Sequence, residues 1–462
     1  MVNEIFWMRG KKITPRAKVI GSHSAKVAII GGGVAGLTIA DELLRSGIHD
    51  VVILEAGFCG SGASGRSSGF ITPASELELS QLRRRFGDDD TRILWNAAQR
   101  GCDAIGETIQ RYQLDCGFLA ADSLYIASDE GSFDVVEEEH ETRLALGYES
   151  RLYDRSSVAQ VIGSDTFGGA VRYGRTFAID SFEYVRTLSE RLAQQGVQIF
   201  EGSAVTSVDG GVARTREGSV RAESIFFSLD HRACGIGVAK QEAYHAQTFL
   251  TISEPLDEAL ARSIFPDGPQ LVWDTDLIYQ YFRLTPDRRL LLGGGLLSRT
   301  YAPERPNDGV PVQHLLDYVR RRFPQIEGVR FESMWPGLIG VTKDLLPLAG
   351  KCEGRPGHYA ALCSSGLPWS VLAARVAVQI AIDGKSELSD FLDPQRSFTE
   401  LDLTQPVVRK PLTFALSHAY AKSLLKGDAR RVSQRKQVIK RVSLGAAIAV
   451  LLILAWRRLR RC

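Results

Sequence analysis

The residues best placed to do chemistry lie near the N-terminus, in a glycine turn between two apolar runs. Gly31, Gly33 and Gly36 have the spacing G-x-G-x-x-G and follow the strand-like run 27–30. In this pattern the first glycine turns the chain, the second lets a pyrophosphate approach the backbone, and the third lets helix and strand pack closely. Glu55 ends the second apolar run, where a carboxylate can accept hydrogen bonds from a ribose diol. The pattern predicts a dinucleotide-binding βαβ unit, whose other contact residues we expect to be Val34, Ala35 and Ala56.

A second loop rich in glycine and serine, residues 57–73, follows this unit. Its small residues Gly62, Ala63 and Ser64 allow the backbone to approach phosphates, and Arg66, followed by Ser67, offers a positive charge. A flavin dinucleotide is long enough to need donors beyond the first helix, so the loop indicates FAD. The alternative interpretation is an ordinary flexible loop.

Length and composition are those of a large globular protein. A chain of 462 residues with 44% hydrophobic content can form two lobes plus extensions. Seven cysteines without a C-x-x-C pair favour a reducing compartment, and scattered histidines give no metal motif. The mixed, basic N-terminus has no signal-peptide core, so we expect the catalytic body in the cytoplasm.

The C-terminal part differs in charge from the rest of the chain. Residues 395–441 predict a basic helical linker, and the apolar run 442–459 between basic pairs is a candidate transmembrane tail. A helix lying in the membrane plane or on a partner, or a buried core helix, are the alternatives. The basic run lacks interleaved aromatic residues, so we expect no nucleic acid as partner. The prediction is therefore a protein anchored to a membrane by its C-terminus.

Periodicity places several further elements. Helices are predicted over 76–119, 135–147 (exposed), 182–196 and 313–323, and strands over 123–128, 197–210, 247–252 and 271–292.

Three blocks together carry a resemblance to a known family. They are GSGASGRSSG at 60–69, WDTDLIYQYFRLTPDRRLLLGGG at 273–295, and MWPGLIGVTKDLLPLAG at 334–350. In order and spacing they resemble the D-amino-acid oxidase family of FAD-dependent oxidoreductases, nearest to its gamma-glutamylputrescine oxidoreductase and glycine and sarcosine oxidase branches. The resemblance covers most of residues 25–394.

The resemblance implies an α/β fold with a Rossmann-like FAD domain of the glutathione-reductase type and an antiparallel-sheet substrate domain. The FAD domain would comprise 25–75, 155–235 and 330–394, and the substrate domain 76–154 and 236–329. Val205 resembles a residue whose backbone contacts the adenine ring, and a core strand valine is the alternative. Gly337 stands where sarcosine oxidases carry a flavin-linking cysteine. We therefore expect noncovalent FAD.

A helix start near the C-terminal end of the family match is expected to stabilise the reduced flavin. Gly366 ends a turn, Pro368 suits a first helical turn, and the backbone around Ser365 and Leu367 can direct amides and the positive helix end toward the flavin. Asp230 and His231 depart from the family's usual turn beside the cofactor.

For the substrate, Arg283 resembles the arginine that grips a carboxylate in amino-acid-oxidising members, with Tyr279 and Tyr281 on the same strand face. A structural ion pair is the alternative for Arg283. Apolar Leu291 replaces a lysine linked to oxygen use, which leaves a quinone or another carrier open as electron acceptor. The expected reaction is oxidation of a C–N bond in a small amine or amino acid. The alternatives are oxidation of a non-amine such as a 2-hydroxy acid, and a non-catalytic interaction protein.

Overall fold

Two large sheets and a small third one organise the chain. The computed structural model describes residues 1–74, 76–230, 236–238, 243–276, 278–296, 309–342, 344–362 and 366–396. The small sheet pairs β9 (Phe177–Ala178) with β4 (Phe70–Ile71) and β5 (Leu119–Ala120).

The first large sheet has eight strands and contains the predicted βαβ unit. At its centre β2 (Gly21–Ile30) runs parallel to β3 (Val51–Leu54) on one side and to β13 (Gly218–Phe227) on the other. Residues 27–30 at the end of β2 and all of β3 are apolar and buried, as expected for parallel strands covered on both faces. The other strands are β10 (Gln198–Phe200), β11 (Ser207–Asp209), β12 (Val212–Arg214), β19 (Leu348–Lys351) and β20 (His358–Leu362).

The second large sheet has nine strands and is mostly antiparallel. Two neighbouring pairs in it are parallel, β1 with β18 and β15 with β6. Its order is β1 (Val2–Asn3), β18 (Phe331–Thr342), β14 (Ala243–Pro255), β17 (Arg289–Gly294), β16 (Tyr281–Leu284), β15 (Gln270–Asp274), β6 (Asp122–Ala127), β8 (Gly169–Tyr173) and β7 (Arg151–Asp154).

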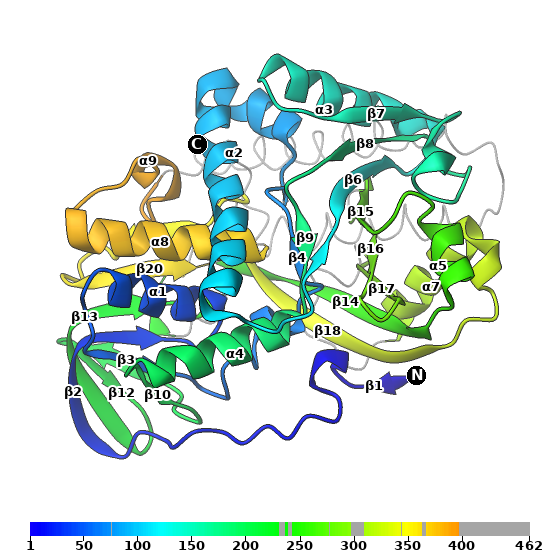
Figure 1. Cartoon of the computed structure of the whole chain (residues 1–462). Coiled ribbons are helices and arrows are strands. Elements are labelled where there is room, and N and C mark those ends of the chain that lie inside the picture. Colours follow the sequence, from blue (N-terminus) through cyan, green and yellow to red (C-terminus); the bar gives the residue numbers. More distant parts are fainter. Residues whose placement is uncertain are drawn as a thin grey trace, which may run out of the picture. The chain divides into compact units, whose positions relative to one another are not determined.

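Helices cover both sheets (Figure 1). Against the eight-stranded sheet, α8 (Leu367–Asp383) packs on β19 and β20 and also contacts α1 (Val34–Arg45) and α2 (Leu79–Tyr112). Against the nine-stranded sheet, α3 (Phe133–Ala145) packs on β6 to β8, and α7 (Val310–Arg322) on β14 and β17. The remaining helices are α4 (Ser181–Gln194), α5 (Glu258–Ile264) and α9 (Ser389–Leu392), with short 3-10 turns at Phe6–Met8, Ala63–Arg66, Glu130–Ser132, Val158–Gln160 and Pro324–Ile326.

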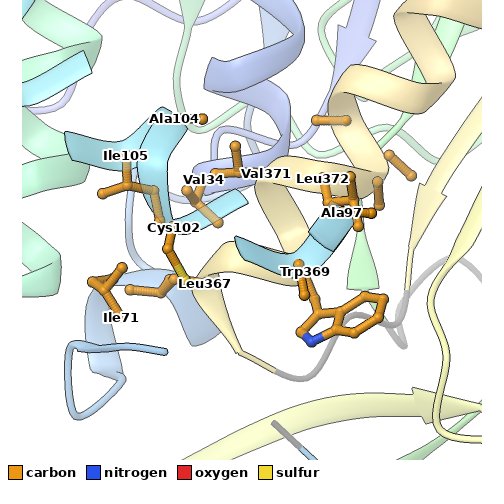
Figure 2. Close-up of a cluster of buried hydrophobic side chains, with 14 of the residues drawn as sticks. Val34, Ile71, Ala97, Cys102, Ala104, Ile105, Leu367, Trp369, Val371 and Leu372 are labelled. Atoms are coloured by element: carbon orange, nitrogen blue, oxygen red, sulfur yellow. The ribbon is translucent and has the colours of Figure 1, made fainter. Parts of the chain in front are cut away.

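The starts of α1 and α8 share one apolar core with the middle of α2. Val34, Cys102, Ile105 and Leu367 point toward one another in this core (Figure 2). Helix α2 approaches so closely that a Cβ on Gly101 would lie 2.4 Å from the carbonyl oxygen of Pro368. This packing fixes the two helix starts relative to each other.

The α/β fold predicted from the sequence is confirmed, while several element limits differ. The strand predicted over 197–210 is two strands, β10 and β11, and Val205 lies between them. The predicted helix 76–119 ends at Tyr112, because Gln113 takes a left-handed conformation with φ of 51°. Helix α3 is not fully exposed, since Glu139 and Arg143 form a buried ion pair.

Two strands pair outside the domain predicted for them, and the predicted tail lies outside the described residues. Strands β8 and β18 fall in ranges assigned from the sequence to the FAD domain, yet both pair in the nine-stranded sheet. Local pattern does not show which distant strand becomes a partner. The predicted tail 442–459 and nearly all of the linker 395–441 lie outside the described residues. Among the helices of the described ranges, none combines the length and the apolar character of a membrane span.

Candidate cofactor and substrate site

The glycine turn has the geometry that the motif predicts. Gly31 has φ of +114°, and a Cβ there would lie 2.3 Å from the carbonyl oxygen of Ser228. A Cβ on Gly36 would lie 1.9 Å from the carbonyl oxygen of Gly31, so only glycine lets α1 approach β2 this closely. Gly33 is the N-cap of α1, and the amide of Val34 donates to Ser64 Oγ at 3.0 Å. The first amides of α1 have no acceptor within the helix, so this helix start can bind an anion.

Glu55 is held in a fixed orientation at the carboxyl end of β3. Its carboxylate accepts hydrogen bonds from the amides of Gly32 at 2.7 Å and Gly57 at 2.8 Å. A carboxylate has acceptor sites beyond these two bonds. Glu55 can therefore still accept from a diol, at the edge of a parallel sheet where ligands of such folds bind.

A cavity of about 210 Å³ lies where these elements meet. It brings together most of the residues predicted from the sequence. Those that line it are Gly33, Val34, Ala35, Ala63, Ser64, Arg66, Ser67, Tyr279, Tyr281, Gly337, Gly366, Leu367 and Pro368.

Those of the other predicted residues that the structure describes do not line this cavity. Gly31, Gly36 and Glu55 shape the turn beneath it, while Ala56 and Gly62 lie nearby in sequence. Ser365 is outside the described residues. Val205 packs against the buried apolar cluster of the eight-stranded sheet, and it does so from a loop rather than from a strand.

The start of α8 forms another side of the cavity. Gly366 is its N-cap with φ of +83°, a conformation that favours glycine, and Pro368 stands in the first turn. Gly384, also with φ of +83°, ends the helix. The positive end of the α8 dipole thus faces the same space as that of α1.

Buried side chains hold the carbonyl groups of the loop 66–68. Trp335 Nε1 donates to the carbonyl of Arg66, and Trp7 Nε1 to that of Ser67, both at 2.9 Å. Arg283 Nε donates to the carbonyl of Ser68 at 2.8 Å. Three successive peptide groups are therefore fixed from outside the cavity. The sequence analysis missed Trp7, because a tryptophan in a mixed N-terminal segment shows no periodicity.

The position of Arg283 corrects the expectation that it grips a substrate carboxylate. Its side chain is 1% exposed and is not part of the cavity lining. Besides Ser68, its guanidinium donates to the carbonyls of Ile179 at 2.8 Å and Leu284 at 3.0 Å. Burial lowers the pKa of Arg283 to about 10, while Asp180 acts in the opposite direction. The group is still a cation at neutral pH, and its donors serve the backbone.

Tyr281 and Asp230 are polar groups that line the cavity. Burial raises the pKa of Tyr281 to about 12, so its neutral phenol can donate a hydrogen bond but is a poor base. Asp230, with φ of 55°, accepts hydrogen bonds from the amide of Gly340 at 2.9 and 3.0 Å. The unusual residue at 230 thus links the end of β13 to β18. His231 lies outside the described residues.

These features define a class of protein. The parallel sheet carries a glycine turn, and a second small-residue loop and a further helix start lie at the same cavity. This combination defines a dinucleotide-binding oxidoreductase fold. The model of the DAO family, FAD dependent oxidoreductase, matches residues 26–380, and the chain belongs to this family. It is an FAD-dependent oxidoreductase.

Individual relatives agree with this assignment. The chain is 28% identical over 387 residues to gamma-glutamylputrescine oxidoreductase of Escherichia coli, covering 82% of this chain and 88% of the relative. It is 22% identical over 350 residues to glycine oxidase of Geobacillus kaustophilus, covering 74% and 88%. A crystal structure of glycine oxidase from that organism has the same fold, with a TM-score of 0.69, 20% identity, and coverage of 81% of this chain and 100% of that one.

The residues present fit FAD. A Cβ at Gly36 would collide with the backbone carbonyl of Gly31 in the glycine turn. A Cβ at Gly33 would lie 2.9 Å from Ser64 Oγ. The amides at the start of α1 suit the pyrophosphate, Glu55 suits the ribose, and the start of α8 suits the flavin carbonyl.

Proposed function

We propose that this protein oxidises the C–N bond of a small amine or amino acid with noncovalently bound FAD. The observation that carries the proposal is the position of Tyr279 and Tyr281, which line the same cavity as the two helix starts. The names of the relatives, an amine oxidoreductase and a glycine oxidase, support the same reaction class.

In the proposed reaction the substrate amine loses its ammonium proton to water in the cavity, and the neutral amine then directs its C–H bond toward the cofactor. When bound, FAD supplies the acceptor for the hydride that leaves this carbon. The substrate is left as an imine, which water hydrolyses to a carbonyl compound and an amine or ammonia. The protein orients the substrate, and the start of α8 offers positive potential for the charge gained by the reduced cofactor. Oxygen, a quinone or another carrier would serve as the final electron acceptor.

Noncovalent attachment follows from the side chains near the proposed flavin position. Gly337 has no side chain that could form a link, and Ser67 and Ser68 occupy the loop position where related dehydrogenases attach flavin through a histidine. Acid treatment should therefore release the flavin into the supernatant.

The proposed function is tested by anaerobic reduction. The purified full-length protein is mixed with a panel of primary and secondary amines, amino acids and 2-hydroxy acids, and the visible flavin absorption is followed. Bleaching by an amine or amino acid, with the matching carbonyl product, supports the proposal. Bleaching by a 2-hydroxy acid alone overturns it in favour of a different substrate class. A flavin that no substrate of the panel reduces also counts against it.

We further propose that the C-terminal tail 442–459 anchors the protein to a membrane, with the catalytic body in the cytoplasm. Support comes from the sequence, where the apolar run stands between basic pairs at 440–441 and 457–458. Full-length protein should sediment with membranes and resist extraction by high salt. A chain ending at Lys410 should remain in the supernatant. Equal partitioning of the two chains would contradict the anchor.

A further inference from the structure

One wall of the cavity consists of aromatic rings. Phe70, Trp273, Tyr279 and Tyr281 all line it, and we call this set the aromatic chamber. The ring centroids of Phe70 and Tyr281 lie 5.6 Å apart at 75°, and those of Tyr279 and Tyr281 lie 5.8 Å apart at 48°. The cavity therefore offers a ligand several π faces, from β15, β16, the segment between these two strands, and β4.

Carboxyl groups bind the polar ends of two of these rings. Tyr279 donates its hydroxyl hydrogen to Glu76 Oε1 at 3.1 Å, and Trp273 Nε1 donates to Glu78 Oε1 at 2.7 Å. Glu78 is buried, and its other oxygen has no hydrogen-bond partner among the described residues. Donation to a carboxyl oxygen moves electron density toward the ring and makes the ring face a better site for a cation.

In the part of the chain that the structure describes, no positive charge stands in the aromatic wall. Behind Trp273, the charge of Arg143 is matched by Glu139 at 2.9 Å, and its guanidinium stacks on Tyr173 rather than on the chamber. Among the described residues that line the cavity, the sole basic side chain is that of Arg66, whose Nε donates to the carbonyl of Ser61 at 3.0 Å. The aromatic wall itself thus carries acceptors behind its rings and no positive charge.

We infer that the aromatic chamber selects an alkylamine that arrives as an ammonium ion and has no carboxylate on the carbon to be oxidised. This inference rests on the proposed function and narrows it from amines and amino acids to amines. An ammonium within about 6 Å of a ring centroid is attracted to the ring face. A carboxylate in the same place would face π density and carboxyl oxygens, with no cationic donor in the aromatic wall to replace the hydration that it loses.

The inference is tested with matched pairs of substrates on the full-length holoenzyme. Butylamine is compared with norvaline, and pentylamine with norleucine, because each compound has a single amine and each pair differs by one carboxylate on the reacting carbon. Anaerobic flavin reduction should be at least about 10-fold more efficient with the amine of each pair, since both members carry an ammonium but only the amino acid must also desolvate a carboxylate beside the rings. Equal efficiency, or preference for the amino acids, overturns the inference while leaving C–N oxidation in place.

A binding measurement separates the chamber from catalysis. Tetramethylammonium lacks a removable N–H and serves as a non-reacting probe, with binding followed by the change in flavin absorption. Tyr279→Leu should raise its Kd about 10-fold, and Tyr279→Phe, which keeps the ring, about 3-fold or less. Tyr148→Leu removes a tyrosine ring outside the cavity and should leave the Kd unchanged.

The outcomes distinguish the two proposals. Tetramethylammonium binding that depends on Tyr279, in a protein whose flavin no amine reduces, would support the chamber and refute the proposed function. Failure of tetramethylammonium to bind, or equal effects of Tyr279→Leu and Tyr148→Leu, would refute the chamber. If Tyr279→Leu does not retain FAD, Phe70→Leu removes another ring of the chamber and should raise the Kd of tetramethylammonium, and an unchanged Kd would refute the chamber.

Discussion

Replacing Arg283 by lysine tests whether this residue braces the flavin loop or binds substrate. The arginine fork serves the carbonyls of Ser68, Ile179 and Leu284, and a single lysine ammonium at this depth can reach about one of them. Each lost hydrogen bond from a charged donor costs about 1.5 kcal/mol at the lower end of the usual range. Loss of two should therefore lower the free energy of unfolding by about 3 kcal/mol. FAD binding should also weaken, because Arg283 no longer braces the loop 66–68 through its full set of hydrogen bonds.

The assay is urea unfolding followed by tryptophan fluorescence, together with titration of the apoprotein with FAD. Arg262→Lys is the matched control, since Arg262 is exposed on α5 and pairs with Glu258 on the surface. The reasoning would be refuted if Arg283→Lys matched Arg262→Lys in stability and FAD affinity while raising KM selectively for substrates that carry a carboxylate. That result would restore the substrate role predicted from the sequence.

Three further predictions concern the cofactor turn, a buried acid and the N-terminal segment. Gly36→Ala should abolish FAD retention, because its Cβ would lie 1.9 Å from a backbone oxygen. The control Gly328→Ala has open space around the new Cβ and should keep equimolar flavin. The flavin absorbance of the purified variants measures both outcomes. Burial and a neighbouring carboxylate raise the pKa of Glu78 from 4.5 to about 8, so the wild-type free energy of unfolding should fall as the pH rises from about 5 to 8. Glu78→Gln should largely remove that fall in denaturation curves across this pH range. Trp7→Phe keeps a ring but loses the bond to the Ser67 carbonyl, and should cost about 1 kcal/mol in stability and weaken FAD binding in a titration.

Much of the cofactor site could be predicted from the sequence because its requirements are local. Gly31, Gly33 and Gly36 are needed for a turn of consecutive residues, and the start of α8 at Gly366 follows from a glycine and a proline within one turn. Each of these patterns is complete within a short segment. The structure places Gly33 and Gly366 at one cavity.

The remainder depends on contacts between distant segments. The local sequence around Arg283 predicts a residue that binds a substrate carboxylate. Its partners in the structure, Ser68 and Ile179, come from other parts of the chain. Likewise, Trp7 reaches Ser67 across 60 positions, and Glu78 reaches Trp273 across 195. Hydrophobic period and motif spacing contain no information on such pairs.

The visible absorption spectrum of the acid-treated protein, followed by anaerobic addition of an amine to the native protein, tests noncovalent FAD and amine oxidation together. We expect equimolar FAD in the supernatant after precipitation and bleaching of the native flavin by an alkylamine. A colourless protein that FAD does not reconstitute, or flavin that stays with the precipitate, would contradict it.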